Sequence, residues 1–370
     1  MNKRNKKYNA PYVLKSGVTL KNRILMAPMT TKLSFHDGDV TKDELEYYAT
    51  RSGEVGAVIT AAANVQDIGK GWEGELSVAS DEHIPSLSSL SNVIQKDGTK
   101  AIIQLFHAGR MTNSKILRKE QPVSASSVAA ERKHAEIPRA LSEDEILEVI
   151  EAFKEAAVRS YKAGFDGIEL HGANTYLIQQ FFSPHSNRRT DQWGGSLENR
   201  YSFIEKLVDE VLLVTAAFTK PFIVGYRFSP EEYETPGISL EDTLYLVDKL
   251  ADKNLDYLHI SLNDYNRKSI SKSFMNESIL HYIHKKINGR VPLIGVGGVN
   301  TKDDLEGVLE NAELVAIGRA LIIDPHWVSK VFNGRENLLK HSISKEDFQL
   351  LKIPRSLSIS LVHMMKNKIK

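Results

Sequence analysis

The sequence predicts one α/β domain with a (β/α)8 TIM barrel fold, and two observations lead to this prediction. Short apolar runs alternate with amphipathic helical patterns along almost the whole chain of 370 residues, as in a barrel of parallel strands with outer helices. Several runs are continuously apolar, which is typical of strands buried on both faces. We expect the barrel at about residues 11–332 and a helical C-terminal extension at 333–370, within a single domain spanning 1–370.

Eight apolar runs are the predicted strands, each bounded by Gly, Pro, Asn or Asp. They are RILMAPM (23–29), GAVITAAANV (56–65), KAIIQLFHAG (100–109), DGIELHGA (166–173), PFIVGYRF (221–228), DYLHISL (256–262), VPLIGVGGV (291–299) and ELVAIGRALI (313–322). The stretch from His107 to Leu141 is rich in Ser, Ala, Lys and Glu. We expect it to be a long excursion after strand three, over the end of the barrel where sites are built.

The predicted helices begin at recognisable caps. Ser142 and Glu145 form the pattern of a capping box, and apolar residues then recur on one face until Gly164 ends the helix. Similar starts for the helices after strands four, five and seven are Ser196, Ser239 and Thr301. The tail RSLSISLVHMMKNKIK (355–370) is also expected to be helical, with no role assigned to it.

A doubly wound sheet is the alternative architecture. Such a sheet usually carries G-x-G-x-x-G after its first strand, whereas here that strand ends in APMTTK, without glycine. The nearest match, GVGGVN (295–300), comes late in the chain and lacks the third glycine. A tightly held dinucleotide is therefore not expected.

The composition is that of a globular protein, with 41% hydrophobic and 26% charged residues. The net charge of +1 gives no electrostatic basis for a nucleic-acid or membrane partner. The basic start, MNKRNKKYNAPY, leads into no apolar segment, and runs such as 55–65 are too short to cross a bilayer. We expect a cytoplasmic protein, and the sequence leaves room for a homo-oligomer.

The chain contains no cysteine. This excludes disulfides, thiolate zinc sites, cysteine nucleophiles and cysteine-ligated iron–sulfur clusters. Any redox chemistry would therefore need a bound cofactor.

Hydrogen-bonding residues gather at the predicted strand ends, where the chemistry of such barrels is located. In chain order these positions are Thr30, Ala62, Gln104, His107, His171, Asn174, Tyr176, Arg227, Gly297, Gly298, Gly318 and Arg319. They include no cluster of carboxylates, so a metal site is not predicted. No lysine ends a strand, which argues against a Schiff-base lyase.

Two glycine turns close predicted strands seven and eight, GVGG at 295–298 and AIGR at 316–319. Many barrels bind a phosphate there through backbone N–H groups, and Arg319 would add a cation. Glycines also end strands simply because turns need positive φ. The sequence leaves both interpretations open, with the adjacent pair favouring phosphate.

His171, Asn174 and Tyr176 follow closely on one another in ELHGANTYLIQQFFSP (169–184). Residues 171 and 174 would face opposite ways along a strand, so they converge only if the chain has already left the strand, as GAN permits. Two N–H donors and an acidic O–H could then bind a carbonyl oxygen and deliver a proton beside it. A turn in which these groups satisfy loop backbone is an equally good interpretation.

Four segments together resemble the Old Yellow Enzyme family of FMN-dependent ene-reductases. They are RILMAPMTT (23–31), QLFHAGR (104–110), GFDGIELHGANTYLIQQFFSPHSNRRTDQWGGSLENR (164–200) and AIGRALIIDP (316–325). The resemblance runs from about Pro11 to about Phe332, and the block at 164–200 is highly specific. It implies an NAD(P)H-dependent flavin oxidoreductase with FMN as cofactor and NADH or NADPH as a transient reductant.

The resemblance also implies which residues hold FMN. Ala27, Pro28, Met29 and Thr30 would run beside the flavin ring, with Ala62 as a backbone contact and Gln104 at the pyrimidine edge. Arg227 would lie near N1 and favour the reduced flavin. The phosphate would be held by Gly297, Gly298, Gly318 and Arg319.

The same resemblance assigns catalytic roles. His171 and Asn174 would grip the carbonyl or nitro oxygen of an activated alkene, and flavin N5 would give hydride to the β-carbon. Tyr176 would protonate the α-carbon from the other face. A prominent branch has cysteine and a nearby tyrosine where this chain has Thr30 and Lys32, so that branch's flavin potential and substrate preference do not transfer.

Alternatives stay open within this class. Related enzymes with nearly the same residues act on nitro compounds or amines, and a flavin-binding protein without ene-reductase activity would share the motifs. The sequence does not choose between NADH and NADPH, nor does it name the natural substrate.

Overall fold

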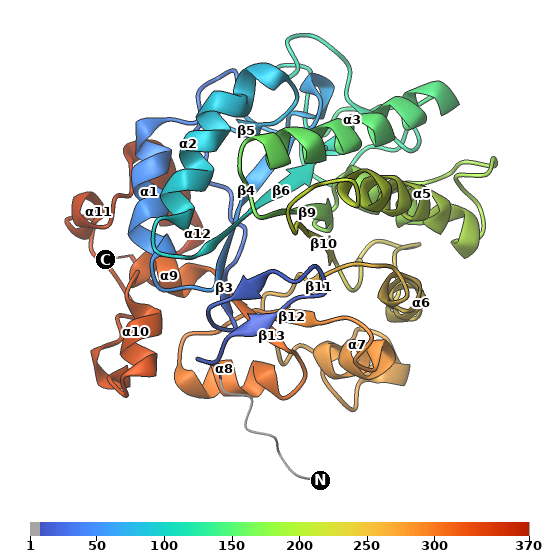
Figure 1. Cartoon of the computed structure of the whole chain (residues 1–370). Helices are drawn as coiled ribbons and strands as arrows, with labels where there is room; N and C mark the ends of the chain where they lie inside the picture. The colour runs from blue at the N-terminus through green and yellow to red at the C-terminus, as the bar shows by residue number, and fades with distance from the viewer. Residues whose placement is uncertain (1–7, 370) are drawn as a thin grey trace.

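A computed structural model describes residues 8–369 and confirms the predicted barrel. Eight parallel strands form a closed ring in which the first pairs with the last, as Figure 1 shows. In chain order they are β3 (Ile24–Met26), β4 (Ala57–Asn64), β6 (Lys100–Phe106), β9 (Gly167–Gly172), β10 (Ile223–Phe228), β11 (Tyr257–Ile260), β12 (Leu293–Val296) and β13 (Leu314–Ile317). A short ninth strand, β5 (Leu76–Ser77), pairs with β4 outside the ring.

Helices connect successive strands and cover the outside of the ring (Figure 1). The connecting helices are α1 (Lys42–Ser52), α2 (Ile84–Gln95), α3 (Glu143–Lys162), the pair α4 (Leu177–Phe182) and α5 (Leu197–Thr215), α6 (Leu240–Ala251), α7 (Ile279–Ile287) and α8 (Lys302–Leu309). Two short helices, α9 (Arg319–Ile323) and α10 (Trp327–Phe332), follow β13. The predicted caps Ser142, Ser196, Ser239 and Thr301 each accept a backbone N–H at their helix starts.

The predicted last strand, 313–322, is wrong in its second half. Strand β13 ends at Ile317, and the apolar residues that follow Gly318 form the buried helix α9. The predicted seventh strand, 291–299, is likewise longer than β12. A continuous apolar run cannot be told from a buried helix by periodicity, which explains the first error. The second error arises because β12 ends at the turn of Gly297 and Gly298, which have positive φ.

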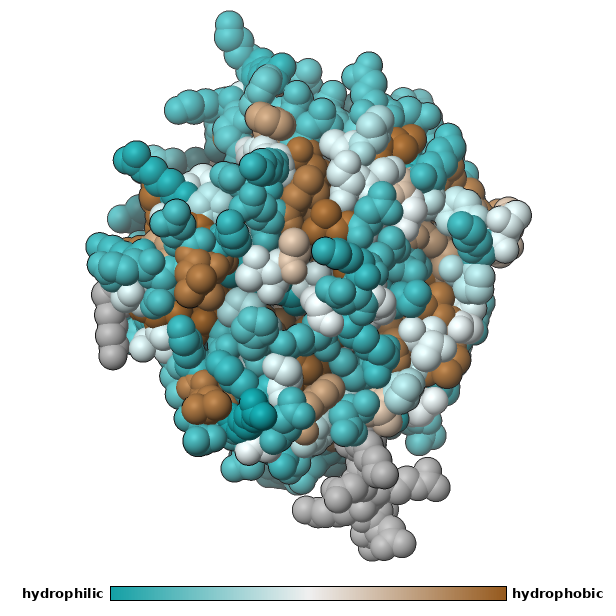
Figure 2. Space-filling view, turned by 60° about the vertical axis from the view of Figure 1, so that its left-hand side comes forward, coloured by the Kyte–Doolittle hydropathy of each residue, from teal (hydrophilic) through white to brown (hydrophobic). Residues whose placement is uncertain are grey.

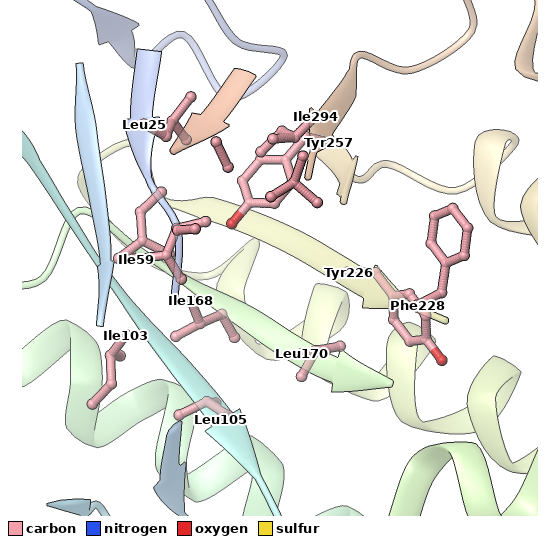
Figure 3. Packing of buried hydrophobic residues seen from close by; sticks show 14 of the residues in the cluster. Leu25, Ile59, Ile103, Leu105, Ile168, Leu170, Tyr226, Phe228, Tyr257 and Ile294 are labelled. Atoms are coloured by element: carbon pink, nitrogen blue, oxygen red, sulfur yellow. The ribbon is translucent and has the colours of Figure 1, made fainter. Parts of the chain in front are cut away.

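Along each barrel strand, alternate side chains point into the ring. On β9, Glu169 and His171 point inward, whereas Ile168 and Leu170 lie among the apolar side chains of Figure 3. Gly225 of β10 pairs with Tyr257 of β11, and a Cβ at Gly225 would lie 2.1 Å from the tyrosine ring. The glycine therefore gives the Tyr257 ring its place inside the barrel.

Additional segments close both ends of the barrel. A hairpin of β1 (Tyr12–Val13) and β2 (Thr19–Leu20) reaches the strand beginnings, where Ser16 N–H donates to Asp256 just before β11 (2.8 Å). The predicted excursion after β6 carries the parallel pair β7 (Val123–Ser124) and β8 (Arg139–Ala140). It is tied to α4 by the Ser124 hydroxyl, which donates to Gln180 Oε1 (2.8 Å).

The C-terminal extension contains α11 (Asp347–Leu350) and α12 (Arg355–Met364) and packs on the barrel beside α1. Arg51 of α1 is buried and donates to the Leu351 carbonyl (2.8 Å). Leu357 and Leu361 of α12 belong to the same apolar core as the barrel residues. Because one core serves both parts, we propose that barrel and extension form a single domain.

The face in Figure 2 carries apolar residues in separate patches between hydrophilic ones. Exposed apolar side chains of the extension include Leu350 (74%), Ile359 (67%) and Met364 (60%). Among the described residues, no helix combines the length and the apolar character needed to cross a membrane.

One buried acid sits beside the end of β3. Glu44 on α1 accepts hydrogen bonds from the hydroxyls of Thr31 (3.0 Å) and Ser34 (2.7 Å). Its side chain is fully buried, and burial raises the pKa of Glu44 to about 7 despite these bonds. Glu44 therefore binds a proton in the folded state at pH values where the unfolded chain has lost it.

We predict that Glu44→Gln changes how the free energy of unfolding depends on pH. In the parent protein, the stability due to neutral Glu44 is fully present below pH 4.5 and is lost as pH rises to about 7. The slope attributable to this group is about −1.4 kcal/mol per pH unit in that window. Urea unfolding of both proteins at pH 5 and pH 7 measures it, and an equal pH dependence in the two would contradict the prediction.

Candidate active site

Two adjoining cavities open at the carboxyl ends of the barrel strands, and all residues that the resemblance assigned to FMN binding or catalysis line one or both. The first spans about 290 Å³ and the second about 610 Å³, and both volumes include space open to solvent. Pro28, Met29 and Arg227 line both. The first cavity adds Thr30, Ala62, Gln104, His171, Asn174 and Tyr176, and the second adds Ala27, Gly297, Gly298, Gly318 and Arg319.

A buried hydrogen-bond network lies beneath the first cavity. Glu169 of β9 accepts from Gln104 Nε2 (2.7 Å) and contacts His259 Nδ1 (2.8 Å), and both Glu169 and His259 are fully buried. Burial acts to raise the pKa of Glu169, but His259, Arg227 and Gln104 outweigh it and hold the pKa below its ordinary value. Because Gln104 Nε2 is used in this way, its amide oxygen is free to accept from a ligand.

Arg227 lies between the two cavities on β10. It is 7% exposed, its Nη2 donates to Ser261 Oγ (3.3 Å), and its Nε is buried without a hydrogen-bond partner in the structure. Burial lowers the pKa of Arg227, and the Glu169 carboxylate opposes this. An arginine pKa starts so far above neutrality that the guanidinium stays charged and can face developing negative charge.

His171 and Asn174 do converge on the first cavity, and an unusual turn brings them together. His171 is still part of β9, and the chain leaves the strand after Gly172. Asn174 (φ +56°) and Thr175 (φ +68°) then both adopt left-handed backbone geometry. Two such residues cost roughly 1 kcal/mol or more each, so the turn needs support from its surroundings.

Side chains of neighbouring elements provide that support. Ser229 Oγ accepts from Asn174 N–H (2.8 Å), and Gln179 Oε1 accepts from Thr175 N–H (2.9 Å). Gln180 Nε2 donates to the Thr175 carbonyl (2.7 Å). Ser261 Oγ donates to Asn174 Oδ1 (2.9 Å), which leaves the amide N–H groups of Asn174 as the donors available to a ligand.

His171 and Tyr176 lie edge to face, with ring centroids 5.1 Å apart. Burial and the nearby Arg227 hold the pKa of His171 well below its ordinary value, so the imidazole is neutral at physiological pH. Its Nδ1 is buried and has no hydrogen-bond partner in the structure. This neutral ring can donate a hydrogen bond without carrying a charge.

Tyr176 caps the N-terminus of α4, and its ring packs edge to face on Phe106 (4.9 Å between centroids) and near Trp72 (6.3 Å). Burial, followed by the nearby Glu75, raises the pKa of Tyr176 to about 12. Burial also raises the pKa of Glu75 well above its usual range, which favours the neutral carboxyl. The phenol therefore keeps its proton throughout the physiological pH range.

The second cavity has the features of an anion site. Gly297 (φ +118°) and Gly298 (φ +72°) use backbone geometry that side chains disfavour, and a Cβ at Gly297 would lie 2.7 Å from the Asp264 nitrogen. Arg319 begins α9 on the same wall. A cation and a glycine turn that line the same cavity suit a phosphate group.

Several lining residues were not predicted from the sequence. Trp72 belongs to the first cavity, and Asn300 belongs to the second, whereas Ser261 supports both Asn174 and Arg227. Asn300 directly follows the predicted GVGGV strand, a position that could have suggested it. Trp72 comes from the irregular connection after β4, for which the sequence offered no placement.

The strand-end residue His107 and the branch-specific position Lys32 line neither cavity. His107 is buried, its Nδ1 accepts from Gly109 N–H (3.0 Å), and burial lowers its pKa to about 3. Lys32 is exposed and lines neither cavity. Within residues 8–369, no group of three or more His, Cys, Asp or Glu side chains is placed to hold a metal ion.

The donor set fits FMN. The second cavity offers a phosphate site, Pro28 and Met29 run from it into the first cavity, and Gln104 and Arg227 present the acceptor and the cation that a flavin pyrimidine edge requires. The buried Nε of Arg227 has no hydrogen-bond partner in the structure, so its N–H is a donor that can serve a flavin.

Comparison with known proteins agrees with this fit. Residues 9–337 match the model of the NADH:flavin oxidoreductase / NADH oxidase family. A probable NADH-dependent flavin oxidoreductase of Bacillus subtilis is 44% identical over 365 residues, covering 98% of each chain. The NADH:acrylate oxidoreductase of Vibrio harveyi is 46% identical over 326 residues, which are 87% of this chain but 32% of that protein.

A similar fold occurs in a solved structure of an Old Yellow Enzyme homologue from Zymomonas mobilis. The TM-score is 0.77 at 26% identity, over 88% of this chain and 92% of the other. The chain therefore belongs to the NADH:flavin oxidoreductase / NADH oxidase family, that of Old Yellow Enzyme, and is an FMN-dependent enzyme that uses a nicotinamide coenzyme, NADH or NADPH.

Proposed function

We propose that this enzyme reduces the C=C bond of activated alkenes, such as α,β-unsaturated carbonyl compounds and nitroalkenes. The observation that carries the proposal is the shared lining of the first cavity by two neutral N–H donors, His171 and Asn174, and a protonated phenol, Tyr176. FMN bound beside them would supply hydride, which it receives from NADH or NADPH.

The donor pair acts on the substrate's oxygen. A carbonyl or nitro oxygen that accepts from both His171 and Asn174 becomes more electron-withdrawing, so the β-carbon becomes electrophilic. Because the turn and Ser261 fix Asn174, these donors need little rearrangement when negative charge develops on that oxygen. This preorganisation is the usual source of electrostatic stabilisation in enzymes.

Tyr176 would act as the proton donor for the α-carbon. Its hydroxyl belongs to the same cavity as the donor pair, and its raised pKa keeps it protonated but weakly acidic. Such a group can complete the reduction once the adjacent carbon has gained electron density. Thr30, Ala62, Gln104 and the residues of the second cavity would hold the cofactor, as the sequence predicted.

A second candidate is an NAD(P)H dehydrogenase that passes electrons to another acceptor. The chain matches about a third of the Vibrio harveyi enzyme, so that protein's acrylate chemistry is not assigned to the matched part. Reduction of nitro compounds would also use the same donors. A cytoplasmic location and a homo-oligomer remain predictions from the sequence.

The visible spectrum of the FMN-loaded protein distinguishes these functions. We expect anaerobic NADH or NADPH to bleach the flavin absorption and cyclohexenone then to restore it. Bleaching without recovery by the enone would favour the second candidate, whereas the absence of bleaching with either coenzyme would contradict both.

Tyr176→Phe tests the proton donor. We expect re-oxidation of the reduced enzyme by cyclohexenone to slow by about 10²–10⁴-fold, because general-acid catalysis is lost. Reduction by the nicotinamide needs no such proton and should keep its rate. Stopped-flow absorbance measures each half-reaction separately, and Tyr282→Phe, on the outer helix α7, is the control. A selective loss of flavin reduction in Tyr176→Phe would rule out the assignment.

His171→Ala tests the oxygen-binding pair. Loss of one N–H donor should weaken binding of a phenolate such as 4-hydroxybenzaldehyde about tenfold or more, because a hydrogen bond to a charged oxygen is lost. The FMN content should stay at the parent value, since Gln104 and the phosphate site are unchanged. Titration of the phenol-induced absorbance change gives the Kd for the phenolate, and the flavin absorbance before the titration gives the FMN content. An unchanged Kd would exclude His171 from the pair.

A further inference from the structure

The last residues of the described chain contact Asn300, which lines the second cavity. Lys368 Nζ donates to Asn300 Oδ1 (2.6 Å), although 68 residues separate them. The tail is fixed at this point, because Ile343 N–H donates to the Lys368 carbonyl (2.9 Å) and Lys368 N–H donates to the Met365 carbonyl (2.8 Å). Ile343 and Met365 are buried. Lys368 is thus held in place by hydrogen bonds of both its backbone and its side-chain ammonium.

Asn300, the partner of Lys368, is itself part of the cavity wall. Its side-chain Nδ2 donates to the Gly298 carbonyl, and its own carbonyl accepts from Trp327 Nε1 (3.0 Å). These bonds orient the amide so that Oδ1 faces the lysine. Two hydrogen bonds, both made by the Asn300 side chain, therefore connect Lys368 to the glycine turn that the sequence favoured for phosphate.

Lys368 lies near enough to Arg319 of the cavity wall for the two positive charges to interact. Burial lowers the pKa of Lys368, and the positive charge of Arg319 lowers it further, whereas Asp304 opposes the shift. Bringing two like charges together at a partly buried place costs free energy. A dianion in the cavity would offset that cost, because it would attract both charges.

We propose that Lys368 is a further binding residue for the FMN phosphate, and that the C-terminal segment completes the phosphate site. The ammonium is bonded to Asn300, which lines the cavity together with Gly298 and Arg319, so its charge can add to that of Arg319. The C-terminal tail, which was assigned no role from its sequence, would then help to bind the cofactor through its phosphate.

The test compares FMN with riboflavin, which lacks the phosphate. Both flavins are titrated into apoprotein while quenching of flavin fluorescence is followed. We expect Lys368→Met to weaken FMN binding about tenfold, because one charge-assisted interaction is lost, and to leave riboflavin binding unchanged. Lys368→Arg should keep most of the preference for FMN, and Lys366→Met, an exposed tail lysine, should keep all of it.

A structural role would give a different result. If Lys368 only fastens the tail to Asn300, Lys368→Met weakens both flavins equally, and the proposal is overturned. An unchanged affinity for both flavins overturns it as well.

The parent protein provides a test that does not depend on folding of a variant. Lys368 is acetylated with a limiting amount of an amine-reactive acetyl donor, and the extent of modification is followed by mass spectrometry. We expect the rate of acetylation to fall when FMN is bound but not when riboflavin is bound. Lys366 in the same digest is the internal control. Equal protection by the two flavins would show that the phosphate does not reach Lys368.

Discussion

The carboxylate of Glu169 in the middle of the barrel is the constraint on which the site depends. A buried negative charge is costly unless it is paired and hydrogen-bonded. Here Gln104 and His259 bond it directly, and Arg227 contributes a favourable charge. The bond from Gln104 orients its amide toward the cavity, and the carboxylate attracts the Arg227 guanidinium in the cavity lining. The interior of the barrel thus prepares two polar groups that the cofactor needs.

The turn after β9 performs a similar task on the substrate side. Its left-handed residues Asn174 and Thr175 are unfavourable in themselves. Hydrogen bonds from Ser229 and Ser261, which directly follow β10 and β11, and from side chains of α4 hold the turn. Ser261 joins the two sides, since it accepts from Arg227 and donates to Asn174. Cofactor-binding and substrate-binding residues are therefore coupled through one hydroxyl group. His171 on strand β9 and Asn174 in the hydrogen-bonded turn therefore present their N–H groups in a fixed geometry.

The extension links the phosphate end of the site to the outside of the barrel. It is anchored on α1 by Arg51, its apolar residues join the common core, and its last residues reach Asn300. A segment that was assigned no function from its sequence thus contacts the wall of the cofactor cavity. This position also explains why barrel and extension share one hydrophobic core.

The sequence by itself determined the barrel, its helix caps and the residues at the strand ends, because hydrophobic periodicity and cap chemistry are local signals. Four family motifs then supplied the roles proposed for those residues. Only the tertiary structure decided that His171 and Asn174 converge through a left-handed turn, and that Trp72, Ser261 and Asn300 belong to the site. It also brought Lys368 to Asn300. These contacts join segments far apart in the chain, and their geometry depends on packing that no local pattern encodes.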